Sequence, residues 1–122
     1  LQTVDTVFVR HALPKGEMMH RDKPVDLTKV RHTALMTVEG EKDDISGVGK
    51  TRATHDLCVN IPKERQLYHL QSKVGHYGVF NGSRFTREIV PAMNRFMAEM
   101  EKSFVRVGKA KPIANENRAK VA

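Results

Sequence analysis

Two short apolar runs in the middle of the chain predict a small parallel sheet. Thr33–Glu39 (TALMTVE) is a nearly continuous run of apolar and β-branched residues that ends at Gly40, the pattern of a strand buried on both faces. Gln66–Leu70 (QLYHL) is a second strand candidate. The intervening stretch Gly47–Cys58 fits an amphipathic helix. Its expected inward positions are Val48, Ala53, Leu57 and Cys58. This order predicts a right-handed βαβ unit whose strands are parallel neighbours, and therefore an α/β fold.

The most regular apolar pattern lies between Ser83 and Phe104 and predicts a long amphipathic helix. Its apolar residues recur at spacings of three and four, as one helix face requires. They are Phe85, Ile89, Met93, Phe96, Met97, Met100 and Phe104. Pro91 removes one backbone donor, so we expect a kink or a second helix start there.

The N-terminal third has a weaker pattern. The apolar residues of Leu1–Val9 recur at helical spacing and predict the end of a helix that packs against other sequence. His11–Pro24 contains prolines and a glycine among charges and predicts an irregular segment. Asp26–Arg31 fits one helical turn. Because the chain begins at Leu1 without a signal-peptide pattern, we expect it to be part of a longer protein.

Most of the formal net charge of +7 lies at the end of the chain. Residues 105–122 include five basic residues and one acidic residue, which is typical of a solvated basic tail. The rest of the chain has no basic stripe interleaved with aromatic residues, so the charge does not indicate nucleic-acid binding. We expect residues 1–107 to form the folded part and residues 108–122 a flexible basic tail.

The composition argues against a membrane-spanning, a disulfide-linked or a metal-binding protein. No apolar run reaches the roughly 20 residues that a membrane-spanning helix needs. Cys58 is the only cysteine, which excludes an intrachain disulfide and favours a cytoplasmic location. The six histidines are scattered, without a pair at metal-ligand spacing such as His-Glu-x-x-His. We therefore predict no metal and no cofactor.

The first candidate for chemistry is the acidic run Gly40-Glu41-Lys42-Asp43-Asp44, directly after the first predicted strand. In an open α/β sheet, ligands bind beyond the carboxyl ends of the strands, where a carboxylate could orient a catalytic base. The alternative is structural, because Asp43, Asp44 or Ser46 could simply cap the following helix.

The second candidate is Gly75-His76-Tyr77-Gly78, shortly after the second predicted strand. Flanking glycines let the backbone bend sharply and leave the imidazole accessible, as a general base requires. Two loops at the same end of neighbouring parallel strands would bring a carboxylate and this histidine together. Acid before histidine is also the chain order of the α/β-hydrolase triad, in which the nucleophile comes earlier.

The segments ALMTVEGEKDDISGVG and HLQSKVGHYGVFNGSRF resemble the C-terminal region of intracellular poly(3-hydroxybutyrate) depolymerases, over about Leu1 to Met97. The resemblance implies the C-terminal portion of an α/β-hydrolase fold, with Asp43 as the triad acid and His76 as the general base. It also implies ester hydrolysis in polyhydroxyalkanoate, a polymer or granule surface as partner, and a cytoplasmic, granule-associated location. Asp44 fits the acid less well, because the hydrolase pattern places the carboxylate directly after Gly-x-x.

The chain departs from the family in one respect: it contains no Gly-x-Ser-x-Gly-like nucleophile elbow. The serines (Ser46, Ser72, Ser83 and Ser103) and Cys58 all lie outside such a pattern. We therefore expect the serine or cysteine nucleophile and the oxyanion hole in a preceding part of the same enzyme. This chain alone should be inactive.

Three other functions are compatible with parts of the sequence. Gly47-Val48-Gly49-Lys50-Thr51 resembles the end of a phosphate-binding loop, but Asp44 occupies the place of its first glycine. A non-catalytic module could bind a polymer granule or partner through the tail or the apolar helix. An acyltransferase of the same fold would use the same triad. In the hydrolase that the resemblance implies, Tyr77, Val79 and Phe80 could line the active site, or they could simply pack in the fold.

Overall fold

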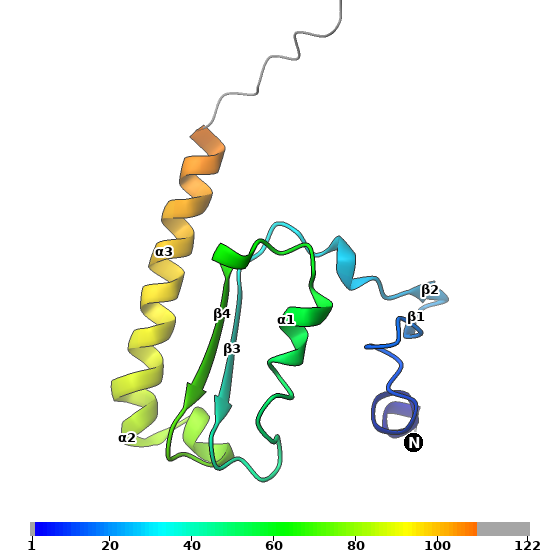
Figure 1. Cartoon of the computed structure of the whole chain (residues 1–122), viewed down its shortest axis with the longest axis horizontal. Helices are drawn as coiled ribbons and strands as arrows, with labels where there is room; N and C mark the ends of the chain where they lie inside the picture. The colour runs from blue at the N-terminus through cyan, green and yellow to red at the C-terminus, as the bar shows by residue number, and fades with distance from the viewer. Residues whose placement is uncertain (1, 110–122) are drawn as a thin grey trace, which may run out of the picture.

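A two-stranded parallel sheet forms the centre of the chain. The computed structural model describes residues 2–109, and for residues 106–109 only the backbone. Strand β3 (Leu35–Gly40) pairs in parallel with strand β4 (Gln66–Gln71). Figure 1 shows the two arrows pointing the same way, so the carboxyl ends of both strands lie at one edge. The predicted pair of parallel strands, within an α/β arrangement, is confirmed.

The two faces of the sheet contact different helices. Thr37 of β3 lies opposite Tyr68 of β4, and the Thr37 hydroxyl is 2.8 Å from Nε2 of His55 in helix α1 (Ala53–Leu57). On the other face, Gln71 donates a 2.6 Å hydrogen bond to Glu88 in the C-terminal helical region. Figure 1 shows α1 and α3 on either side of the sheet. The strands are only half-buried along most of their length, because two strands and these helices do not enclose both faces.

The helix predicted over Gly47–Cys58 is mostly wrong. Only five residues, Ala53–Leu57, are helical, and the residues before them form turns. Gly49 has a left-handed φ of +97°, and several amides of this stretch donate to a side chain instead of continuing a helix. Of the expected inward positions, Cys58 is buried and Leu57 is half-buried, whereas Val48 and Ala53 are exposed.

The predicted C-terminal helix is confirmed. Helical backbone runs without a break through α2 (Gly82–Arg84), the π-helical turn η5 (Phe85–Ile89) and α3 (Val90–Lys109). The π-turn ends at Ile89, two residues before Pro91, and the helix continues through this proline, which has no amide donor.

The apolar face of α3 is covered only in part. Ile89 and Phe96 are buried, but Met93, Met97 and Phe104 are exposed to 36% or more. The exposed side chains line an apolar groove of about 440 Å³ together with residues of β3 and the segment before it. The groove residues are Ala34, Met36, Met93, Phe96, Met97, Met100, Glu101 and Phe104. Two strands are too few to cover a helix of this length.

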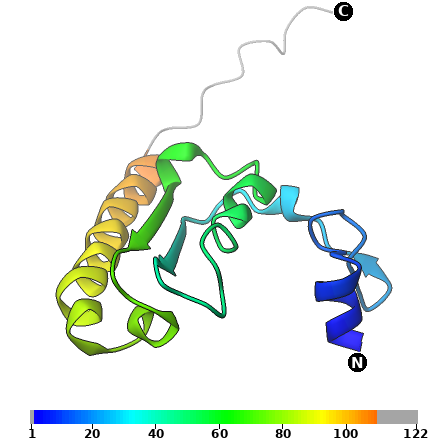
Figure 2. The ribbon, with the colours of Figure 1, turned by 60° about the horizontal axis from the view of Figure 1, so that its bottom comes forward.

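The N-terminal segment lies beyond α1, on the far side from the sheet, in both Figure 1 and Figure 2. As predicted, it begins with helical backbone, here a π-helix η1 (Val4–Val9) whose apolar residues are exposed. The segment predicted to be irregular contains a hairpin of two-residue strands, β1 (Met19–His20) and β2 (Lys23–Pro24). The single turn expected near Asp26 is the 3-10 helix η2 (Leu27–Lys29).

Two further 3-10 helices flank β4, namely η3 (Lys63–Arg65) before it and η4 (His76–Val79) after it. Among residues 2–109, no helix combines the length and the apolar character that crossing a membrane requires. Helix α3 continues two residues past the predicted boundary at residue 107. Residues 110–122 of the predicted tail lie outside the described residues.

Candidate active site

Asp43 lies in a tight turn just beyond the carboxyl end of β3. Its Oδ1 atom accepts hydrogen bonds from the backbone amides of Ile45, at 2.9 Å, and Ser46, at 2.8 Å, and only 4% of its side chain is exposed. The Ser46 amide lowers the pKa of Asp43; burial opposes this effect, and hydrogen bonds from His76 and Ile45 add to it. Asp43 is thus held as a carboxylate, whereas Asp44 is exposed.

His76 begins η4, beyond the carboxyl end of β4. Backbone hydrogen bonds fasten its loop to the Asp43 loop, from the Glu41 amide to the Gln71 carbonyl and from the Lys42 amide to the Val74 carbonyl, both at 2.9 Å. Figure 2 shows the two loops side by side at the end of the sheet. Because β3 and β4 are parallel, Asp43 and His76 lie at the same end of the sheet.

Glycines allow the two loops to approach closely. A Cβ atom on Gly40 would lie 2.8 Å from the Val74 carbonyl oxygen of the other loop, whereas one on Gly78 would lie 2.6 Å from the Val74 Cβ within the His76 loop itself. Gly75 has an ordinary φ of −91°. The glycines beside His76 were predicted to permit a sharp bend. At Gly78, glycine is needed because any larger side chain would collide with Val74.

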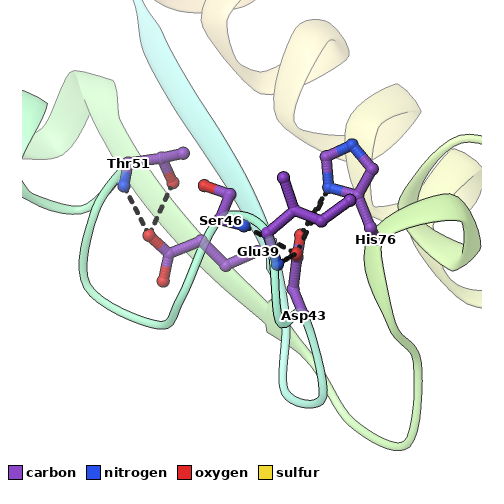
Figure 3. A network of polar contacts seen from close by, with 6 residues as sticks. Glu39, Asp43, Ser46, Thr51 and His76 are labelled. Carbon is purple, nitrogen blue, oxygen red and sulfur yellow. Dashed lines mark hydrogen bonds and ion pairs between the residues drawn. The ribbon is translucent and has the colours of Figure 1, made fainter. Parts of the chain in front are cut away.

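The structure brings Asp43 and His76 into contact. Nδ1 of His76 is 3.0 Å from Oδ2 and 3.2 Å from Oδ1 of Asp43. Figure 3 shows the other ring nitrogen pointing away from Asp43, and 29% of the His76 side chain is exposed. Exposed Tyr77 and Phe80 contact the imidazole edge-on, with ring centroids 5.6 and 5.8 Å from it. An imidazole oriented by a buried carboxylate, with its second nitrogen free of that carboxylate, can act as a general base.

A family model described as "PHB de-polymerase C-terminus" matches residues 1–101, which include both loops. The chain belongs to this family. Comparison with curated proteins and with solved structures gave no match. The resemblance stated from the two sequence segments is thereby confirmed, and a role in PHB depolymerisation follows from it.

Sequence reasoning missed a second buried carboxylate in this PHB depolymerase region. Glu39, the penultimate residue of β3, is only 2% exposed. Its donors are the amides of Gly49 (2.6 Å), Thr51 (2.5 Å) and Arg52 (3.1 Å) and the hydroxyls of Thr51 (2.9 Å) and Tyr68 (2.7 Å). Figure 3 shows Glu39 reaching Thr51 on the side of the loop away from His76.

Hydrogen bonds keep the Glu39 carboxylate charged. Burial acts to raise its pKa, but the donors, led by the Gly49 amide and the Tyr68 hydroxyl, outweigh burial and lower the pKa from 4.5 to about 2. The hydrogen bond between the Tyr68 hydroxyl and Glu39 raises the pKa of Tyr68. Successive backbone amides that point at one anion form an anion-binding nest. In the sequence, the glycine-rich stretch Gly47–Thr51 was the signal for this nest.

This arrangement argues against the phosphate-binding interpretation of Gly47–Thr51. The amides of Gly49 and Thr51 already donate to Glu39 of the same chain. The loop therefore resembles a phosphate-binding loop because it surrounds an anion, but in this PHB depolymerase region the anion is an internal carboxylate.

His55 has a structural role that contrasts with the position of His76. It is 8% exposed, and its Nδ1 is 2.8 Å from the Gln66 side-chain oxygen while its Nε2 contacts Thr37. These bonds join α1 to both strands. The described part of the chain holds no group of three or more His, Cys, Asp or Glu side chains that could bind a metal ion.

Proposed function

We propose that this chain takes part in the hydrolysis of ester bonds in intracellular poly(3-hydroxybutyrate) or a related polyhydroxyalkanoate. Asp43 and His76 would be the acid and the base of a triad whose nucleophile is a serine or a cysteine. The observation that carries the proposal is the 3.0 Å hydrogen bond between these side chains, in a chain that belongs to the PHB depolymerase family.

In this mechanism the free Nε2 atom of His76 removes the proton of the nucleophile as it attacks the ester carbonyl. The tetrahedral intermediate collapses, the C–O bond breaks, and His76 returns the proton to the departing alcohol. Water, deprotonated by the same nitrogen, then attacks the acyl carbonyl of the acyl-enzyme; the bond to the nucleophile breaks, His76 returns the proton to the nucleophile, and a hydroxy acid is released. Asp43 keeps the remaining proton on Nδ1 and stabilises the imidazolium that forms twice in each cycle.

The nucleophile and the oxyanion hole would come from a preceding part of the same enzyme. In this proposal residues 1–107 are the C-terminal part of an α/β-hydrolase domain, and residues 108–122 are its basic tail. Within the described residues β3 pairs along one edge only, and parallel sheets are normally larger and covered on both faces. The open apolar groove beside α3 supports the same arrangement, because further strands of the sheet would cover it.

The exposed aromatic residues Tyr77 and Phe80 would line the substrate site beside His76. A polyester presents alkyl groups and uncharged esters, which suit an apolar lining better than a charged one. The polymer would be reached at the surface of storage granules, and the enzyme would act in the cytoplasm.

The proposal is tested by measuring hydroxyacid release from amorphous polymer granules by the full-length enzyme that contains this chain. We expect His76→Ala to lower the rate by about 10³-fold or more, while circular dichroism shows a folded protein. Asp44→Asn is the matched control, because Asp44 is an exposed neighbour of the candidate acid, and its rate should stay close to that of the natural enzyme.

Each alternative function has its own outcome in this assay. Unchanged hydrolysis by His76→Ala would refute the catalytic assignment and leave a polymer-binding module. Repeating the assay with an added acceptor alcohol separates hydrolysis from acyl transfer. Products that are mainly new esters, with little free acid, would contradict the hydrolase assignment.

A further inference from the structure

Two carboxylates hold the loop from Asp43 to Arg52, one at each end. Asp43 accepts the amides of Ile45 and Ser46 at the start of the loop. Glu39 accepts the amides of Gly49, Thr51 and Arg52 at its end. Only two residues, 47 and 48, separate the two groups of amides, so a displacement at the end of the loop would be transmitted to its start.

We propose that Glu39 is a positioning residue for the Asp43–His76 pair. By fixing the end of the loop, Glu39 holds the Ser46 amide against Oδ1 of Asp43, 2.8 Å away. With Oδ1 held by the amides, Oδ2 is the oxygen closer to Nδ1 of His76, at 3.0 Å against 3.2 Å for Oδ1. This inference rests on the proposed function, since it concerns how the candidate acid is oriented.

The position requires a charged carboxylate rather than any polar side chain. All five groups around Glu39 are donors, and both carboxylate oxygens are in use: Oε2 faces the Gly49 amide and the Tyr68 hydroxyl, and Oε1 faces Thr51 and Arg52. A glutamine would point its own N–H donors at one of these two groups. The φ of +97° at Gly49 turns its amide toward the carboxylate, with open space where a Cβ would lie.

Glu39 also links the acid loop to the strand that leads to the histidine. Tyr68, its fifth donor, lies on β4, and the His76 loop follows the end of that strand. The Arg52 guanidinium lies 5.5 Å from the centre of the Tyr68 ring and closes the same cluster. One buried side chain therefore restrains both elements that present the pair.

The test is a double-mutant cycle in the full-length enzyme, with polymer hydrolysis as the readout. Because a small misplacement of a reacting group has a large effect on rate, we expect Glu39→Gln to lower kcat by about 10- to 100-fold. KM should change by less than about threefold, since Glu39 is too buried to touch substrate. In an Asp43→Asn background the same change should lower kcat by less than about twofold, because the carboxylate whose orientation depends on Glu39 has been replaced by an amide that no longer supports catalysis.

Two further measurements keep the proposal falsifiable if Glu39→Gln folds poorly. Gly49→Ala strains the same amide without touching Glu39 and should lower kcat in the same direction. The ¹H resonance of the His76 Nδ1 proton should move or broaden in both variants, which a purely structural role would not cause. Asp26→Asn is the control, because the Asp26 carboxylate holds the Thr28 amide of another turn, at 3.0 Å, and neither readout should change.

The outcomes separate this inference from the proposed function. If Asp43→Asn alone leaves hydrolysis unchanged, the proposed function fails. If Asp43→Asn is impaired but Glu39→Gln lowers kcat equally in both backgrounds, or leaves the His76 resonance unchanged, the positioning role is refuted and the triad assignment stands.

Discussion

Oδ2 of Asp43 lies 3.0 Å from Nδ1 of His76, although 33 residues separate them in the sequence. The two residues meet because each follows one of two neighbouring parallel strands. The two oxygens of Asp43 differ in their contacts: Oδ1 accepts two backbone amides and lies 3.2 Å from Nδ1 of His76, whereas Oδ2 is closer to that nitrogen, at 3.0 Å.

The amide contacts of Oδ1 predict the effect of Asp43→Asn. The asparagine oxygen should stay with the Ile45 and Ser46 amides, which places the side-chain NH₂ group against Nδ1 of His76. The histidine proton would then move to Nε2, and the nitrogen that must accept a proton would already carry one. We expect hydrolysis by the full-length enzyme to fall by about 10²- to 10⁴-fold with little change in the unfolding midpoint. A rate within tenfold of the natural enzyme would contradict this orientation.

The close approach of the two loops predicts that Gly40 cannot be enlarged. In Gly40→Ala the new Cβ would lie 2.8 Å from the Val74 carbonyl oxygen, so the loops must separate. We expect a loss of about 1–3 kcal/mol in the free energy of unfolding, together with a lower rate of hydrolysis. Gly47→Ala is the matched control, because no atom lies within 4 Å of its added Cβ. Equal stability of the two variants, measured by denaturant unfolding, would show that the loops do not need this contact.

His55 and His76 should respond differently to mutation. His55→Ala removes the hydrogen bonds from this ring to the half-buried side chains of Thr37 and Gln66. It should cost about 1–3 kcal/mol of stability, with kcat of the folded protein within about twofold of the natural value. His76→Ala should do the reverse, losing activity but little stability. The measurements are chemical denaturation and hydrolysis assays on the same preparations, and a large loss of kcat in folded His55→Ala would overturn its structural assignment.

The lowered pKa of Glu39 predicts a loss of stability in acid. The folded-state pKa of about 2 lies below the usual 4.5, so Glu39 stabilises the fold fully above about pH 4.5. This contribution disappears as the pH falls from there toward 2. Urea unfolding of the full-length enzyme between about pH 6 and pH 3 should show less loss of stability in Glu39→Gln than in the natural protein. The same pH dependence in both proteins would mean that Glu39 is not stabilised in its ionised form.

Periodicity and residue type were sufficient to predict the main elements and the meeting of the candidate pair. The parallel strands are short apolar runs, and the helix around Ile89 and Phe96 repeats every three to four residues, so local pattern and tertiary packing agree there. The proximity of Asp43 and His76 follows from strand direction, which places the ends of parallel strands together.

The stretch before α1 could not be predicted in the same way, because a side chain distant in sequence determines its conformation. Its apolar spacing indicated a helix, but Glu39 draws the Gly49 and Thr51 amides out of helical geometry. A glutamate next to the end of a strand looks like an ordinary solvent-facing residue until its five donors are assembled around it. The exposure of Met97 was also unpredictable, since it depends on how many strands lie beneath α3.

The most direct test of the account is a double-mutant cycle between Asp43 and His76 in the full-length enzyme, measuring hydroxyacid release from amorphous polymer granules. If the two side chains work as one unit, the double variant Asp43→Asn/His76→Ala should be no slower than His76→Ala alone, within about threefold. Separate losses that multiply in the double variant, or full activity in either single variant, would contradict it.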